Sequence, residues 1–325
     1  SNFGAFATPE RVMAFDINDF DETHPAPFEW DVARLAASIV IATDDIGFDR
    51  HIGQGLAQHA ACRYREQLRS LSEETFLDVW YSKVDFEGRA EYAHEVYSKA
   101  DKKRAQKAVK KAQRKTNVGA LDRLAERVDG EWRIKADPPF IVPATRTGTM
   151  RNRLERFFRQ YIDTLPSDLL PLIHHYQIPD FARKVVGVGS VGTEAHIALL
   201  IGNRGDDALW LQMKEATDSV LERYTISDIF KHQGERVVFG QRLMQASSDT
   251  FLGWASSPTR QKQHVDFYVR QLNDFKTSAD ISSMSERRLS PVSYTHLRAH
   301  ETNDLISYAV FCWKKGGGGG GGGGG

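Results

Sequence analysis

The chain has 325 residues, with 43 basic and 43 acidic side chains and a formal net charge of +0 at pH 7. A balanced charge provides no overall field to attract nucleic acid or an anionic membrane, so we expect neither as a partner. No apolar run is long enough to span a membrane, and Cys62 is the only cysteine ahead of residue 291. An intrachain disulfide in that part is therefore excluded, and we predict a cytoplasmic protein.

The two ends of the sequence do not read as native ends. Ser1 lies inside what reads as a loop, and residues 291–325 finish in a run of glycines that begins at Gly316. This last segment resembles translated sequencing-adapter read-through followed by poly-glycine, and we leave it out of the fold prediction. We predict a helical lobe over residues 1–180, a glycine-loop and antiparallel-sheet lobe over 181–290, and a non-native tail over 291–325.

The first chemically informative stretch is residues 14–21. An apolar approach from Val12 to Phe15 predicts a short buried strand, which delivers carboxylates into a turn. Magnesium takes oxygen ligands and needs only one or two carboxylates in addition to substrate phosphates. We therefore predict a metal half-site formed by Asp16 with Asp19 or Asn18, to which Asn2 offers a further amide ligand; the alternative is an Asx-rich turn that satisfies its own backbone.

Residues 31–173 read as mostly helical. Helices are predicted at 31–44, 51–68, 73–81, 90–115 and 151–164, and Ser72 is predicted to be an N-cap. Residues 99–115 are strongly basic, which is typical either of a phosphate or nucleic-acid patch or of a solvated helix face. The absence of interleaved aromatic residues from this stretch favours the solvated face.

Residues 184–193 contain a GxGxxG string, whose candidate nucleotide-binding members are Gly187, Gly189, Ser190 and Gly192. A dinucleotide-binding fold requires a helix after this string, whereas alternating strands are predicted here at 195–201 and 208–213. A kinase-type loop instead requires a hairpin that covers phosphates and a lysine on the third strand. Lys214 has that spacing; the alternative is an ordinary hairpin with a surface lysine.

A helix is predicted at 235–246 and an alternating strand at 265–272, which resembles the end of a kinase small lobe before its hinge. Such a helix supplies an acid that pairs with the lysine. Glu235 and Glu222 are both candidates and Gln241 is a polar substitute. The sequence does not choose among them.

The order of loop amide, strand, Asp turn and Trp-Asp helix resembles the catalytic half of aminoglycoside phosphotransferases and choline kinases. On that resemblance Asn2 and Asp16 bind metal, Asp31 begins the following helix, and the catalytic Asp and His lie ahead of Ser1. The whole pattern more closely resembles an uncharacterised bacterial family, domain of unknown function 2252. The segments that carry this second resemblance are 2–4, 15–22, 30–36, 184–193, 212–216, 240–245 and 267–272.

The kinase resemblance implies an α+β, two-lobed protein-kinase-like fold in permuted order, with the mostly helical large lobe first and the antiparallel-sheet small lobe second. It also implies a phosphotransferase that uses ATP and Mg²⁺ on an unknown acceptor substrate. The fragment as written would then bind nucleotide without turnover. A nucleotidyltransferase on the same fold and a non-catalytic nucleotide-binding or scaffold protein are the alternatives, and the oligomeric state is left open.

Overall fold

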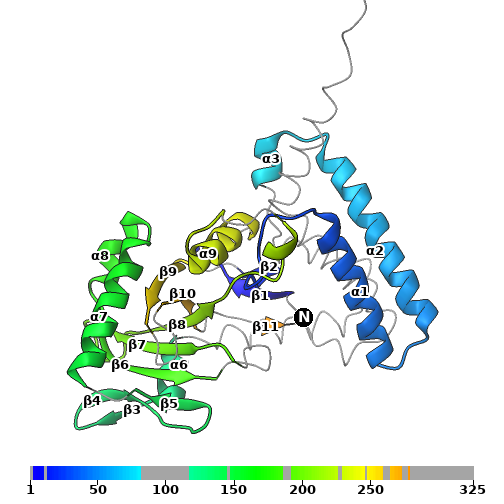
Figure 1. Cartoon of the computed structure of the whole chain (residues 1–325). Helices are drawn as coiled ribbons and strands as arrows, with labels where there is room; N and C mark the ends of the chain where they lie inside the picture. The colour runs from blue at the N-terminus through cyan, green and yellow to red at the C-terminus, as the bar shows by residue number, and fades with distance from the viewer. Residues whose placement is uncertain are drawn as a thin grey trace, which may run out of the picture.

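The computed structural model describes residues 3–10, 13–81, 117–144, 147–185, 192–225, 229–245, 247–258, 264–272 and 277–278. The fold is a mixture of helix and sheet, which confirms the α+β class (Figure 1). None of the helices in these ranges combines the length and apolar character needed to cross a bilayer.

The centre of the fold is a six-stranded antiparallel sheet with the strand order β5-β6-β7-β8-β10-β9. Its strands are β5 (Ile141–Pro143), β6 (Gln177–Lys184), β7 (Ala195–Ile201), β8 (Ala208–Ala216), β9 (Gly253–Ser257) and β10 (Val265–Gln271). β6, β7 and β8 follow one another as hairpins, whereas β10 inserts between β8 and β9. The strands predicted at 195–201, 208–213 and 265–272 are therefore confirmed.

β7 and β8 are buried along almost their whole length because both faces of the sheet are covered. Helix α7 (Gly148–Asp163) packs on one face through Phe157, Phe158 and Tyr161. The opposite face is shared by two groups: α6 (Asn117–Leu124) with the hairpin β3 (Ala125–Val128) and β4 (Glu131–Ile134), and helix α9 (Gln233–Met244). Burial on two faces explains the nearly continuous apolar sequence of these strands.

A second, smaller sheet lies beside α9 and has the order β11-β1-β2 (Figure 1). Its strands are β1 (Phe3–Ala7), β2 (Met13–Ile17) and β11 (Thr277–Ser278). β1 and β2 form an antiparallel hairpin in which Gly4 is opposite Asp16. The sequence predicted the second strand of this hairpin but treated the first as a loop.

Two long helices, α1 (Glu29–Asp45) and α2 (Arg50–Leu71), pack against each other after this sheet. The Asp49 side chain caps α2 by accepting a hydrogen bond from the His51 N–H at 2.8 Å. A Cβ on Gly53 would lie 2.2 Å from the Thr43 Oγ1, so glycine permits the close helix crossing. Leu35, Leu56 and other residues of the pair share a core with β2 and α9.

The structure corrects two details of the prediction. Ser72 is the C-cap of α2 and not an N-cap; Thr75 caps α3 (Phe76–Tyr81) by accepting from the Asp78 N–H at 3.2 Å. The mostly helical reading of residues 31–173 missed β3, β4 and β5. Residue 180, the predicted lobe boundary, lies in β6, which pairs with β5 in the large sheet. The helix predicted at 90–115 lies outside the described residues.

Candidate polar site between the two sheets

The candidate site forms where the chain leaves β2 and passes the middle of the large sheet. Lys214 on β8 and Tyr268 on β10 are directly opposite each other in the strand register. The Lys214 Nζ lies 2.5 Å from the Asp21 Oδ2, and the Tyr268 hydroxyl donates to the Asp21 Oδ1 at 2.6 Å. One carboxylate, 193 residues away from Lys214 in the sequence, therefore joins two neighbouring strands.

The electrostatics of this contact favour an ionised Asp21. Burial by itself would raise the pKa of the Asp21 carboxyl, but the Lys214 charge and the hydrogen bonds from Lys214 and Tyr268 outweigh it and hold the pKa below its ordinary value. Burial, together with the Asp21 charge, raises the pKa of Tyr268 well above its ordinary value, against the effect of Arg270. Tyr268 therefore remains protonated and a hydrogen-bond donor at neutral pH.

A second cation, Arg270, lies two residues after Tyr268 on β10. Arg270 is opposite Gln212 in the register, and its Nη1 donates to the Asn18 main-chain oxygen at 3.4 Å. Burial would lower the pKa of this guanidinium, yet the surrounding Tyr268, Asp21, Asp249 and Asp19 groups raise it on balance. The site thus holds two positive charges, Lys214 and Arg270, close to the acidic turn that follows β2.

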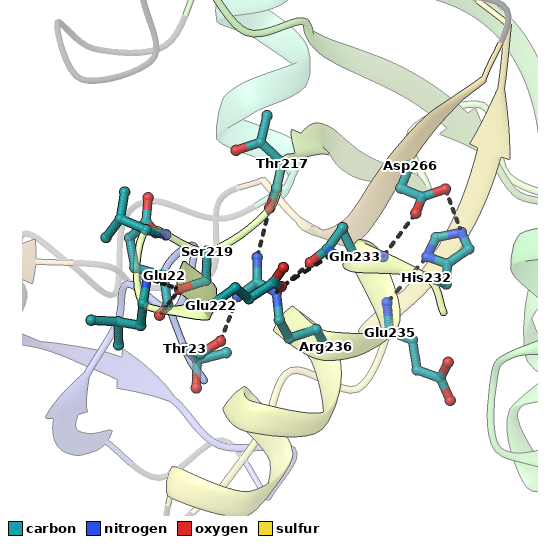
Figure 2. A network of polar contacts seen from close by, with 12 residues as sticks. Glu22, Thr23, Thr217, Ser219, Glu222, His232, Gln233, Glu235, Arg236 and Asp266 are labelled. Atoms are coloured by element: carbon teal, nitrogen blue, oxygen red, sulfur yellow. Dashed lines mark hydrogen bonds and ion pairs between the residues drawn. The ribbon is translucent and has the colours of Figure 1, made fainter. Parts of the chain in front are cut away.

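A third cation, Arg236, fastens the acidic turn to α9. The Arg236 guanidinium donates to the main-chain oxygens of Thr23 at 2.5 Å and Thr217 at 2.8 Å, as Figure 2 shows, and to that of Asp21 at 3.0 Å. The helix itself begins at a histidine cap, where the His232 Nδ1 accepts from the Glu235 N–H at 3.3 Å. Main-chain carbonyls thus accept most of the hydrogen bonds that the buried Arg236 guanidinium donates.

The acid that pairs with Lys214 is Asp21 and neither of the two glutamates that the sequence proposed. Glu235 contributes its main-chain N–H to the helix cap. The Glu222 Oε1 accepts from the Gln233 Nε2 at 3.2 Å and lies 3.8 Å from the Arg236 Nε. The third candidate, Gln241, donates to the Gln245 Oε1 at 2.9 Å, on the side of α9 that faces β2.

The predicted metal and phosphate residues are placed only in part. Asp16 lies on β2 with 0% exposure, and its Oδ1 accepts from the Ile17 N–H at 2.7 Å. Asp19 is exposed, in the turn beyond the strand. Gly192 has a positive φ of 99°, which suits glycine in the turn that leads into β7. Asn2, Gly187, Gly189 and Ser190 lie outside the described residues.

The residues present fit a divalent cation only if a substrate supplies oxygens. Within the described ranges, no group of three His, Cys, Asp or Glu side chains is arranged to hold a metal ion. Asp16 and Asp19 provide two carboxylates, which is the usual protein contribution to a magnesium ion that also binds phosphates. Among the described residues, this donor set is therefore too small to hold a metal ion by itself, and a metal bound here would need further oxygens from a ligand.

Sequence reasoning placed Asp21 in the acidic turn without giving it a partner, and it missed Tyr268, Arg270 and Arg236 as members of this site. The period-two alternation of residues 265–272 does place Tyr268 and Arg270 on the same face of their strand. No local signal identifies what they meet, since Asp21 and Asn18 lie in the connection after β2, far away in the sequence.

A separate cavity lies on the opposite face of the large sheet, beneath α7. Its lining includes Phe157, Phe181, His196, Met213 and Phe267. Side chains alternate between the faces of a strand, so Met213 and Phe267 point away from the face that carries Lys214 and Tyr268. Burial, reinforced by nearby arginines, lowers the pKa of His196 to about 4, and its ring stacks on Phe181 at 5.0 Å. This cavity is mainly apolar, although Arg153 and Glu194 also line it, and it is distinct from the polar site.

These observations define a mixed α+β protein whose two sheets meet at a partly exposed cluster of lysine, arginine and aspartate side chains. A family model described as "Uncharacterized protein conserved in bacteria (DUF2252)" matches residues 1–300, and the chain belongs to that family. The matched range extends past residue 290, where the foreign tail was predicted to begin. No curated protein and no solved structure matches the chain.

Proposed function

We propose that this chain has a kinase-like architecture in permuted order and belongs to a phosphotransferase that uses ATP and Mg²⁺. The observation that carries the proposal is the contact between Lys214 and Asp21. It brings the turn after β2, predicted to hold the metal, to the lysine of the β6–β7–β8 hairpin, predicted to hold the phosphates. The permutation hypothesis requires that these segments, which are remote in sequence, meet in one site.

The order of parts around Lys214 is also that of a kinase small lobe. The hairpin β6–β7 precedes the lysine strand β8, helix α9 follows, and β9 and β10 complete the sheet. In kinases the corresponding lysine is on the third strand and orients the nucleotide phosphates. The β6–β7 connection, residues 185–194, contains the glycine string of the sequence.

In the proposed site, Lys214 orients the phosphates, and Asp16 with Asp19 supplies carboxylate oxygens to the metal. Magnesium bound to ATP neutralises phosphate charge, which is the main contribution of a metal to phosphoryl transfer. Arg270 adds a second, permanently charged group beside the same turn. Asp21 holds the Lys214 ammonium in place through the ion pair, with Tyr268 fixing the carboxylate. No residue is assigned as the base that accepts the proton of the acceptor.

The proposal is tested by nucleotide binding, measured as a thermal shift with ATP in the presence and absence of Mg²⁺. A ligand that binds only the native state adds about 2.7 kcal/mol at a hundredfold excess over Kd, which is a shift of several degrees. We expect a Mg²⁺-dependent shift in the wild type that is lost in Lys214→Gln and reduced in Asp19→Asn. Lys135→Gln is the matched control, since Lys135 donates to the Asp122 main-chain oxygen far from this site.

The possible results separate the proposed function from its alternatives. A shift that is equal with and without Mg²⁺, or that survives Lys214→Gln, would place the nucleotide elsewhere and contradict the proposal. No shift in any variant would leave a scaffold role. If the nucleotide binds and an acceptor is found, the mass added to the acceptor distinguishes transfer of one phosphate from transfer of a nucleoside monophosphate.

A further inference from the structure

Arg236 is an unusual residue for the interior of a helix-to-sheet contact. Its side chain is 1% exposed, although a guanidinium is charged at every accessible pH. Burying a cation is costly unless its donors are filled. Here three main-chain carbonyls, those of Asp21, Thr23 and Thr217, accept from it, and the Nε donates to the Gln233 Oε1 at 2.5 Å. The nearest carboxylate oxygen in the described network, on Glu222, is 3.8 Å away.

The positions of these acceptors show what the arginine connects. Thr217 directly follows β8, the strand of Lys214. Asp21 and Thr23 belong to residues 18–28, the irregular connection between β2 and α1, which no regular element stiffens. Glu22, between them, is held by the same post-β8 segment: the Ser219 Oγ donates to its main-chain oxygen and the Val220 N–H to its carboxylate (Figure 2). Arg236 thus clamps the acidic turn to the end of the lysine strand.

Helix α9 touches the same turn at a second point. Gly240 is four residues after Arg236, so both lie on one face of the helix. A Cβ at Gly240 would lie 2.3 Å from the Thr23 Oγ1 and 2.4 Å from the Thr23 Cγ2. The helix therefore lies directly on Thr23, with no side chain between them. Any displacement of α9 must move the turn that carries Asp21.

We propose that Arg236 is a positioning residue that sets the Asp21 carboxylate before Lys214, so that the position of α9 determines whether the lysine is paired. The helix acts on the lysine through the main chain of the acidic turn and not through an acid of its own. The inference deepens the proposed function, on which it rests, by naming a regulatory connection of the same site. The contact between Lys214 and Asp21 is nevertheless measurable without nucleotide.

The test measures how fast Lys214 is acetylated by acetic anhydride at neutral pH, by mass spectrometry, with Lys184 of β6 as internal reference. Loss of fold exposes both lysines, whereas release of the ion pair exposes only Lys214. We expect Asp21→Asn to raise the ratio of the Lys214 rate to the Lys184 rate about fivefold, and Arg236→Gln to raise it nearly as much. Arg236→Lys should give an intermediate ratio, because it keeps the charge but replaces the separate Nη1 and Nη2 donors of the planar fork by a single nitrogen.

The matched control is Arg242→Gln, on the same helix. The Arg242 Nη2 donates to the Leu252 main-chain oxygen at 2.6 Å and contacts no part of the acidic turn in the hydrogen bonds of the described residues. In Arg242→Gln the ratio of the Lys214 rate to the Lys184 rate should remain at the wild-type value. Gly240→Ala adds a methyl group against Thr23 and removes no charged group. Like Arg236→Gln, it should raise the Lys214 acetylation rate. It therefore provides a second route if Arg236→Gln fails to fold.

The double variant Asp21→Asn with Arg236→Gln decides the mechanism. If Arg236 acts through Asp21, the double variant is acetylated no faster at Lys214 than Asp21→Asn alone. Independent, multiplying effects would overturn the inference, as would an unchanged ratio in both Arg236→Gln and Gly240→Ala. ATP affinity is measured separately on the same proteins. If ATP does not bind but the acetylation ratios of the single and double variants are as expected, the proposed function alone is rejected. If ATP binds but these ratios differ from expectation, the positioning role alone is rejected.

Discussion

The two faces of the large sheet differ in chemistry although they are built from the same strands. The face under α7 is an aromatic core in which Phe267 meets Phe157 edge to face at 5.8 Å. On the opposite face the next residue along β10, Tyr268, holds Asp21 beside Lys214. The comparison shows that one strand can stabilise the fold with one set of side chains and build a polar site with the alternate set.

The largest expected effect separates stability from the polar site. Phe267→Ala removes a side chain that is 3% exposed and leaves a cavity under α7, which should cost about 3 to 5 kcal/mol of unfolding free energy. Urea denaturation measures this as a lower midpoint with an unchanged slope. The Lys214 acetylation ratio of the folded protein should not change, since Phe267 points to the other face. A loss below about 1 kcal/mol would show that α7 does not depend on this contact.

The next effect is a pH dependence that also belongs to the α7 face. His196 has a folded-state pKa of about 4, below its ordinary value, so between these values the unfolded chain binds a proton that the folded chain does not. Stability is therefore present above pH 6.5 and is lost as the pH falls, by about 2 kcal/mol at pH 5. His196→Phe, which can still stack on Phe181, should lose this part of the pH dependence. The exposed His51→Gln is the control, and equal slopes for all three proteins would contradict the assignment.

The smallest effect belongs to the polar face. Tyr268→Phe removes one hydrogen bond to the Asp21 carboxylate but leaves the ring and the Lys214 contact. A hydrogen bond to a charged group contributes about 1.5 to 3 kcal/mol, and the remaining partner of Asp21 should keep the loss near the lower end. In contrast to Phe267→Ala, this variant should raise the Lys214 acetylation ratio. The comparison between the faces fails if Phe267→Ala and Tyr268→Phe change the unfolding free energy and the Lys214 acetylation ratio in the same proportion.

The sequence predicted much of the fold because its signals there are local. The alternation of residues 195–201, 208–213 and 265–272 identifies strands, since a side-chain period of two is a property of the extended chain itself. The helices of residues 29–45, 50–71 and 148–163 follow from apolar periodicity and were placed within a few residues of their ends. Ser72 was misplaced because a serine followed by acidic residues has the same local pattern whether it ends one helix or begins the next.

The tertiary structure alone decided which charged groups meet. Lys214 and the carboxylates of residues 16–21 were recognised as chemically significant from their neighbours in the sequence. Their pairing through Asp21 depends on the packing of β2, α9 and β8, and no local pattern reports contacts between segments about two hundred residues apart. Arg236 is the clearest case: a lone arginine in a helix reads as a solvated side chain. Only the carbonyls of Asp21, Thr23 and Thr217, brought together by folding, make its burial favourable.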